Sequence, residues 1–118
     1  MNSRNKGKRG ELQCAAIFRQ YGWEAHRTQQ FCGKAGDADV HTNLPLHLES
    51  KWTERLNLTD AMAQAKRDTT WKLPVVVSKK NHCEPLITFP LHLFLEAVAP
   101  NVDWETVERY LRLMGALR

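Results

Sequence analysis

Two short segments that begin with apolar residues flank a turn in residues 39–51, which read DVHTNLPLHLESK. The four residues 42–45 (TNLP) form a cluster that is typical of turns. The segments 40–41 and 46–48 are therefore expected to pair as a β-hairpin. This hairpin is predicted to be the feature around which the rest of the chain is arranged.

Residues 37–51 contain three acidic side chains and one lysine, namely Asp37, Asp39, Glu49 and Lys51. Glu49 and Lys51 are expected on one face of their strand and Ser50 on the other, because strand side chains alternate. The hairpin is expected to place Asp39 beside Glu49. Two carboxylates on adjacent strands suit Mg²⁺ or Mn²⁺, and a nearby lysine can orient the attacking water or stabilise charge on a phosphate. The alternative is an ordinary exposed pair of Glu49 and Lys51, with Asp37 and Asp39 as loop acids.

The order of these motifs along the chain carries further information. A helix with Glu11 precedes Asp39, and the triplet 49–51 precedes a helix with Gln64. In this order the motifs resemble the PD-(D/E)XK nuclease superfamily, in particular its phage-type and archaeal Holliday junction resolvase-like members. The segments 6–12 (KGKRGEL) and 54–65 (ERLNLTDAMAQA) look like a group of phage and prophage endonucleases. The resemblance covers residues 4–89.

The resemblance implies a restriction-endonuclease-like α/β core, in which helices flank a central mixed sheet of four to five strands. It implies a site for Mg²⁺, with Mn²⁺ as a substitute, formed by Asp39, Glu49, the Ser50 carbonyl and Glu11. Lys51 would position the nucleophilic water, and Gln64 would bind water beside the site. The implied reaction is hydrolysis of phosphodiester bonds in DNA, at branched DNA such as a Holliday junction.

Two positions depart from the pattern of the family. Ala38 stands where a proline is usual before the motif aspartate, and Ser50 stands where a branched apolar residue is usual between the acid and the lysine. Asp39 is assigned as the metal ligand because it adjoins Val40 and the strand. Asp37 is the second candidate.

Hydrophobic periodicity and cap residues predict the remaining elements. We expect helices over residues 7–21, 57–69 with Asn57 as cap, and 91–97, strands over 23–27, 73–77 and 86–89, and a loop over 28–36. Pro100 is expected to break the chain, and a final helix is expected to be capped by Asn101 or Asp103 and ended by Gly115. The run 73–77 is continuously apolar, as is typical of a strand covered on both faces. Glu11 lies on the same side of its predicted helix as apolar residues. An acid is favourable near a helix N-terminus, which is one explanation. The other, which we favour, is that Glu11 points toward the metal.

Length and composition predict one domain over residues 1–118, with a basic N-terminal arm at 1–10 and a C-terminal helical extension at 90–118. The chain has no long apolar run and no apolar segment at its N-terminus, so neither a membrane span nor a signal peptide is expected. Three cysteines without C-x-x-C spacing and five scattered histidines predict neither disulfides nor a zinc site. The expected compartment is the cytoplasm of a bacterium that carries a phage or prophage.

The net charge of +4 favours a polyanionic partner. The residues expected to touch the DNA backbone are basic or amide side chains, namely Lys6, Lys8, Arg9, Gln29, Gln30, Lys34, Lys79 and Lys80. The alternative for the N-terminal arm is a solvated tail, and for Lys79 and Lys80 it is an ordinary turn.

Two symmetric nicks are needed to resolve a four-way junction, so we expect a homodimer. Two surfaces are candidates for its interface: the edge strand 86–89, and a C-terminal stripe of Trp104, Val107, Leu111 and Met114. Two other functions stay open, which are a less selective phage nuclease on nicked, flapped or linear DNA and a catalytically silent DNA-binding module.

Overall fold

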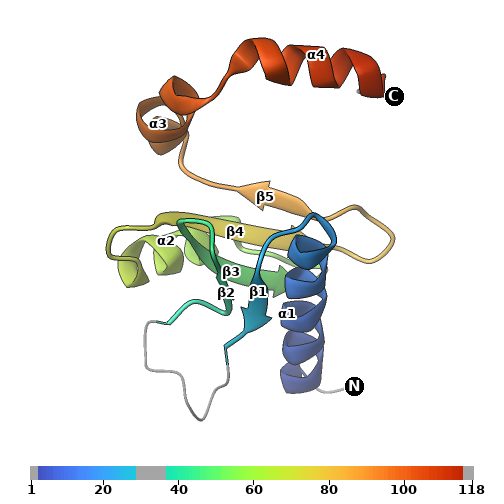
Figure 1. The fold of residues 1–118 in the computed structure, drawn as a ribbon. Helices are drawn as coiled ribbons and strands as arrows, with labels where there is room; N and C mark the ends of the chain where they lie inside the picture. The colour runs from blue at the N-terminus through green and yellow to red at the C-terminus, as the bar shows by residue number, and fades with distance from the viewer. Residues whose placement is uncertain (1–2, 29–36, 116–118) are drawn as a thin grey trace.

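The computed structural model describes residues 3–28 and 37–115 and shows a five-stranded mixed sheet with helices on its faces (Figure 1). In spatial order the strands are β1 (Ala25–Arg27), β2 (Val40–Thr42), β3 (Leu46–Trp52), β4 (Leu73–Lys79) and β5 (Leu86–Thr88). β3 and β4 run parallel, and the other neighbouring pairs are antiparallel. The prediction of a mixed sheet of four to five strands flanked by helices is therefore confirmed.

The hairpin predicted from residues 39–51 is formed by β2 and β3. Val40 lies opposite Leu48 in this antiparallel pair, and both side chains are fully buried. In the turn between the strands, the Leu44 N–H donates a hydrogen bond to Thr42 Oγ1. The hairpin therefore places Asp39, which directly precedes β2, beside the middle of β3.

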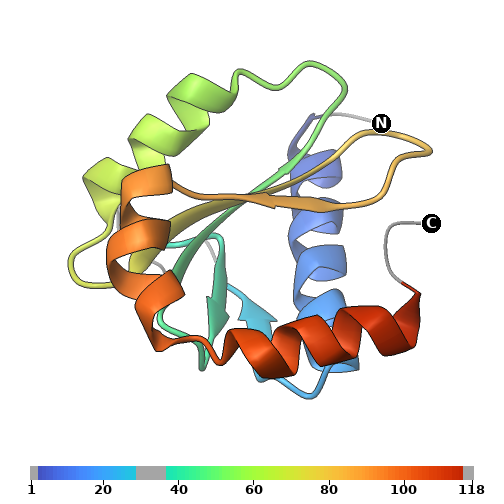
Figure 2. The same cartoon turned by 90° about the horizontal axis from the view of Figure 1, so that it is seen from above.

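Helices α1 (Ser3–Gln20) and α2 (Leu58–Asp68) pack on opposite faces of the sheet (Figure 2). Cys14 and Ala15 of α1 share a buried cluster with Val75 and Val77 of β4. Val76 lies between these two valines and therefore faces the other side, where α2 packs on β4. The prediction that the run 73–77 forms a strand covered on both faces is thus confirmed.

The predicted basic arm is wrong for residues 3–10, because they form the first turns of α1. Lys6, Lys8 and Arg9 are exposed on this helix. The two glycines of the segment suggested a loop, but Gly10 is needed inside the helix. A Cβ atom at Gly10 would lie 2.7 Å from Trp52 Cβ, so α1 can approach β3 only because no side chain is present there.

The N-terminus of α2 is capped as predicted. The Asn57 side chain accepts a hydrogen bond from the Asp60 N–H at 3.0 Å, and the helix ends at Asp68 with Thr69 as its C-cap. This short crossover helix connects the parallel strands β3 and β4.

The C-terminal part is helical over a longer range than predicted. α3 (Leu91–Leu93) continues into a π-helical turn, η1 (Phe94–Val98), and a 3₁₀ turn, η2 (Ala99–Asn101). Pro100 does not break this run as expected, because it stands in the first turn of η2, where a missing N–H costs nothing.

α4 (Trp104–Met114) follows, with Asp103 as its N-cap. Of the two predicted cap residues, the side chain of Asp103 accepts the Thr106 N–H. Gly115 ends the helix in the left-handed conformation, as predicted. Among the described residues, no helix combines the length and the apolar composition that a bilayer crossing requires.

Candidate active site at the acidic end of the hairpin

Asp39 is fixed to β3 by its main chain and by its side chain. Its N–H donates to the Leu48 carbonyl at 2.9 Å, and its Oδ2 accepts from the Ser50 N–H at 2.9 Å. The N–H and C=O of one strand residue point toward the same neighbouring strand. The Ser50 carbonyl is therefore on the edge of β3 that faces Asp39. Asp37 is exposed and lines a hollow beside this edge.

Glu49 is a buried carboxyl group on β3, with 1% of its surface exposed. It shares a strand face with His47, whose Nε2 lies 3.0 Å from Glu49 Oε1. Burial, followed by the charge of Asp39 and a hydrogen bond to it, raises the pKa of Glu49 to about 8. Asp39 and Glu49 are therefore neighbours, as the hairpin predicted.

Glu11 reaches the same region from α1. Its Oε1 accepts a hydrogen bond from Arg27 Nε at 2.7 Å, and both side chains are only 16% exposed. Burial, and then the charge of Asp39, raises the pKa of Glu11, whereas Arg27 and Lys51 lower it. Because α1 begins at Ser3, Glu11 lies too far along the helix to be explained by the dipole at its N-terminus.

Lys51 supplies the positive charge among these acids. It follows Glu49 by two residues on β3, and its charge lowers the pKa of both Glu49 and Glu11. Four of the residues singled out in the sequence are thus brought together at one end of the hairpin: Glu11, Asp39, Glu49 and Lys51.

The side chain of Ser50 points away from this group. Its Oγ is buried and, among the described residues, has no hydrogen-bond partner. Only the main chain of Ser50 can therefore serve the site, which agrees with the role assigned to its carbonyl.

Gln64 occupies the turn of α2 that precedes Asp68. Residues four apart lie on the same side of a helix, so Gln64 and Asp68 share one side. Gln64 is half-buried, and Asp68 lies near Glu49. Gln64 is therefore on the side of α2 that leads to the acidic group.

The residues expected to touch DNA divide into two sets. Gln29, Gln30 and Lys34 lie outside the described residues. Lys79 ends β4 opposite Trp52, and Lys80 is exposed in the turn after it. Gly10 of α1 packs against the same Trp52, so the basic first turns of α1 lead to the end of the sheet where β3 and β4 finish.

Three side chains of this region were not identified from the sequence: Arg27, His47 and Asp68. The signal for His47 was present, because it precedes Glu49 by two residues and therefore shares its face. Arg27 gave no such signal. It lies on β1 and its partner Glu11 lies on α1, so their contact depends on how the helix packs on the sheet.

Comparisons of the chain with protein-family models, with curated proteins and with solved structures gave no match.

Proposed function

We propose that this protein is a metal-dependent endodeoxyribonuclease with a PD-(D/E)XK core, which hydrolyses phosphodiester bonds at branched DNA. The observation that carries the proposal is the meeting of Asp39, Glu49 and Lys51 at the end of the hairpin. Hydrolysis of a phosphodiester requires stabilisation of negative charge on the phosphate and an oriented water. Two neighbouring carboxylates, with an ammonium group near enough to lower the pKa of Glu49, supply the means for both.

The donor set fits a hard divalent cation such as Mg²⁺, with Mn²⁺ as a substitute. Burial and then the nearby charge of Asp39 raise the pKa of Glu49, and a bound cation would offset the repulsion between the two carboxylates. Mg²⁺ binds through one or two carboxylates and keeps several waters. The residues that would hold it are Asp39, Glu49, the Ser50 carbonyl and Glu11. When bound, the cation would act as a Lewis acid on an oxygen of the scissile phosphate.

The protein residues have distinct tasks in this proposal. The Ser50 N–H holds one oxygen of Asp39, which leaves the other carboxylate oxygen for the cation. Arg27 fixes the carboxylate of Glu11. Lys51 donates a hydrogen bond to the attacking water or to the phosphate, and Gln64 binds water beside the site.

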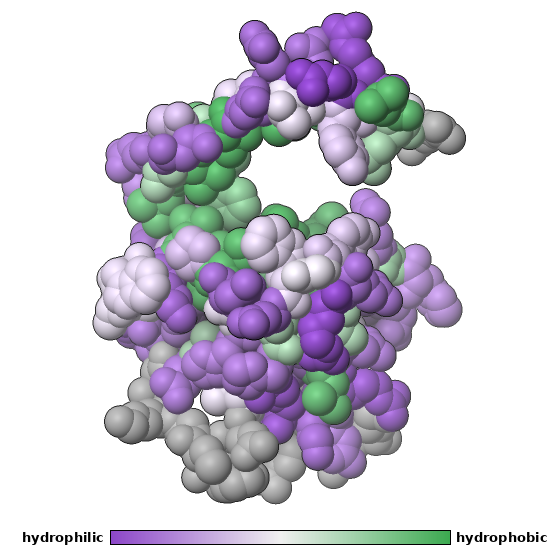
Figure 3. Space-filling view, in the orientation of Figure 1, coloured by the Kyte–Doolittle hydropathy of each residue, from purple (hydrophilic) through white to green (hydrophobic). Residues whose placement is uncertain are grey.

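A homodimer would present two such sites to a four-way junction. The apolar side of α4 has no buried residue and includes Leu111, which is 48% exposed. In the space-filling view an open gap separates this helix from the rest of the molecule, and hydrophobic residues lie at its margin (Figure 3). A helix with this much uncovered apolar surface is suited to packing on a second copy.

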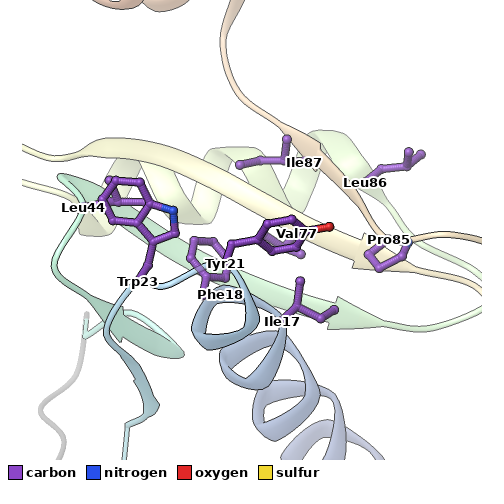
Figure 4. Close-up of a pocket in the computed structure, with 9 residues that line it drawn as sticks. All are labelled: Ile17, Phe18, Tyr21, Trp23, Leu44, Val77, Pro85, Leu86 and Ile87. Carbon is purple, nitrogen blue, oxygen red and sulfur yellow. The ribbon is translucent and has the colours of Figure 1, made fainter. Parts of the chain in front are cut away.

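The same chain offers a surface that α4 of a second copy can cover. An apolar hollow of about 290 Å³ opens between the C-terminal end of α1 and β5, with side chains of both elements pointing toward it (Figure 4). Its lining includes Phe18, Tyr21, Trp23 and Ile87. β5 is also the edge strand named from the sequence.

The place proposed for the dimer is a bacterial cytoplasm that contains phage DNA.

The proposal is tested by incubating the purified protein with labelled four-way junction, flap, nicked and linear DNA, with Mg²⁺, Mn²⁺ or EDTA. We expect cutting of the junction with either cation and none with EDTA. Asp39→Asn and Glu49→Gln should abolish cutting and leave DNA binding intact. Equal cutting of all four substrates would replace the junction enzyme by a less selective nuclease. Binding without cutting on any substrate would leave only a DNA-binding module.

A further inference from the structure

One nitrogen donor and two oxygen donors meet on the side of the sheet that α2 covers. They belong to His47, Glu49 and Asp68, and one donor atom of each lies within 4.8 Å of the other two. His47 and Glu49 stand on one face of β3, and Asp68 is the last residue of α2. Neither His47 nor Asp68 has a task in the nuclease proposed above.

The three side chains stand on elements that strand pairing and hydrogen bonds hold in place. His47 is 6% exposed and Glu49 1%, and both are on a central strand paired with β4. The end of α2 is tied down because the Thr69 N–H donates to Ala65 O and Thr69 Oγ1 donates to Lys72 O. A donor set on rigid elements loses little freedom when it binds an ion.

The group is also open to solvent on one side. A polar hollow of about 310 Å³ is lined by His47 and Asp68, together with Asp37 and His41. Hydrated ions can therefore reach the imidazole and the Asp68 carboxylate, although Glu49 itself is buried.

We propose that His47, Glu49 and Asp68 bind a divalent transition metal ion of the Zn²⁺ type at a position separate from that of the Mg²⁺ ion. Imidazole is a ligand for Zn²⁺ and its neighbours in the first transition series, whereas Mg²⁺ prefers sites made only of oxygen. Three protein ligands leave a coordination position for water, as in open zinc sites. The 3.0 Å contact between His47 Nε2 and Glu49 Oε1 is replaced by two bonds to the same ion.

Glu49 is common to both metal positions, and the other ligands separate them. Asp39 and the Ser50 carbonyl belong to the nuclease site, and His47 and Asp68 belong to the second. The inference does not rest on the proposed function, because it needs no DNA and no cutting.

The test uses the whole chain of residues 1–118, freed of metal by a chelator. Co²⁺ is titrated while its visible absorption is recorded, and Zn²⁺ is then titrated by calorimetry. We expect one Zn²⁺ per chain that displaces the Co²⁺. His47→Gln and Asp68→Asn should each weaken Zn²⁺ binding by at least about 10-fold. This is the lower end of the loss seen when a group that only supports a metal ligand is removed, and removal of a ligand itself should cost no less.

Two variants serve as controls. His41→Gln removes another histidine of the same hollow and should keep the Zn²⁺ affinity of the wild type. Asp39→Asn removes a ligand of the nuclease site whose charge also acts on Glu49, so it should weaken Zn²⁺ binding, but less than Asp68→Asn does. Asp68 is only half-buried and at a helix end, so Asp68→Asn is decisive even if His47→Gln does not fold. Circular dichroism checks the fold of each variant.

Absence of Zn²⁺ binding by the wild type would overturn the inference, and the His47–Glu49 contact would then be a hydrogen bond of the core. Loss of binding in Asp39→Asn with no loss in Asp68→Asn would also overturn it. Zn²⁺ binding through His47 and Asp68 by a protein that cuts no DNA would sustain the inference and refute the nuclease.

Discussion

Gly10 has a hydrogen atom where other residues have a side chain, and this allows α1 to lie close to Trp52 of β3. A methyl group there meets Trp52 Cβ at 2.7 Å, which is too short for any real contact. We expect Gly10→Ala to lower the free energy of unfolding by about 1–3 kcal/mol, as overpacking of a core does. Urea unfolding followed by fluorescence measures the change.

Gly7 is the matched control for this substitution. It lies in the same helix, but a Cβ atom added to it meets no other atom within 4 Å. Gly7→Ala should therefore raise the free energy of unfolding by about 0.5–1 kcal/mol, since alanine is the better helix former. Equal effects of the two substitutions would show that α1 does not rest on Trp52.

Glu49 gives the metal-free protein a characteristic dependence on pH. Burial and Asp39 raise its pKa in the folded state from 4.5 to about 8. The folded state therefore holds this proton more tightly than the unfolded state does. Its contribution to stability is complete below about pH 4.5 and is lost as the pH rises through about 8.

Glu49→Gln isolates this effect because glutamine carries no titrating proton. Relative to this variant, the wild type without metal should lose stability as the pH rises across that range. Thermal unfolding in chelator at several pH values gives the comparison. Parallel pH profiles of the two proteins would mean that Glu49 keeps an ordinary pKa.

The acids of the hairpin were predictable and their surroundings were not. A tight turn and the alternation of strand side chains are local properties, and they placed Asp39 beside Glu49 and Lys51 near both. The partner of Glu11 is set instead by how α1 crosses β1, which local sequence does not encode. The same holds for Asp68, which meets Glu49 only because α2 folds back over β3.

At the scale of elements, α2 depends on its N-cap. The Asn57 side chain accepts the Asp60 N–H and donates to the Asp60 carboxylate. Asn57→Ala should cost about 1 kcal/mol of unfolding free energy, whereas Asn57→Asp should retain most of the stability, because aspartate caps equally well. Urea unfolding decides between them, and equal losses in both variants would argue against a capping role.

Elements with strong local signals were predicted well, and elements shaped by packing were not. The caps Asn57 and Gly115 mark the ends of their helices in the sequence itself. The start of α1 was missed because two glycines weaken the helical signal, and only the contact with Trp52 explains one of them. β1 is also shorter than the predicted strand 23–27.

At the scale of the whole molecule, the uncovered side of α4 predicts a dimer. Light scattering at micromolar concentration should give twice the mass of the chain. Leu111→Asp places a charge on the apolar side and should yield a monomer. Leu113→Asp is the control, because Leu113 is 79% exposed and stands away from the stripe of Trp104, Val107 and Leu111. A monomeric wild type, also monomeric on junction DNA, would remove the paired nicks but leave a simpler nuclease.

Single-turnover cutting of a labelled four-way junction by Lys51→Ala tests the assignment of the catalytic centre most directly. With saturating Mg²⁺ and equal amounts of bound DNA, the variant should cut at least about 10²-fold more slowly than the wild type, the loss usual when one preorganised donor is removed from an active site. Lys66→Ala, which changes an exposed lysine of α2, should cut at the wild-type rate. Undiminished cutting by Lys51→Ala would contradict the proposed centre.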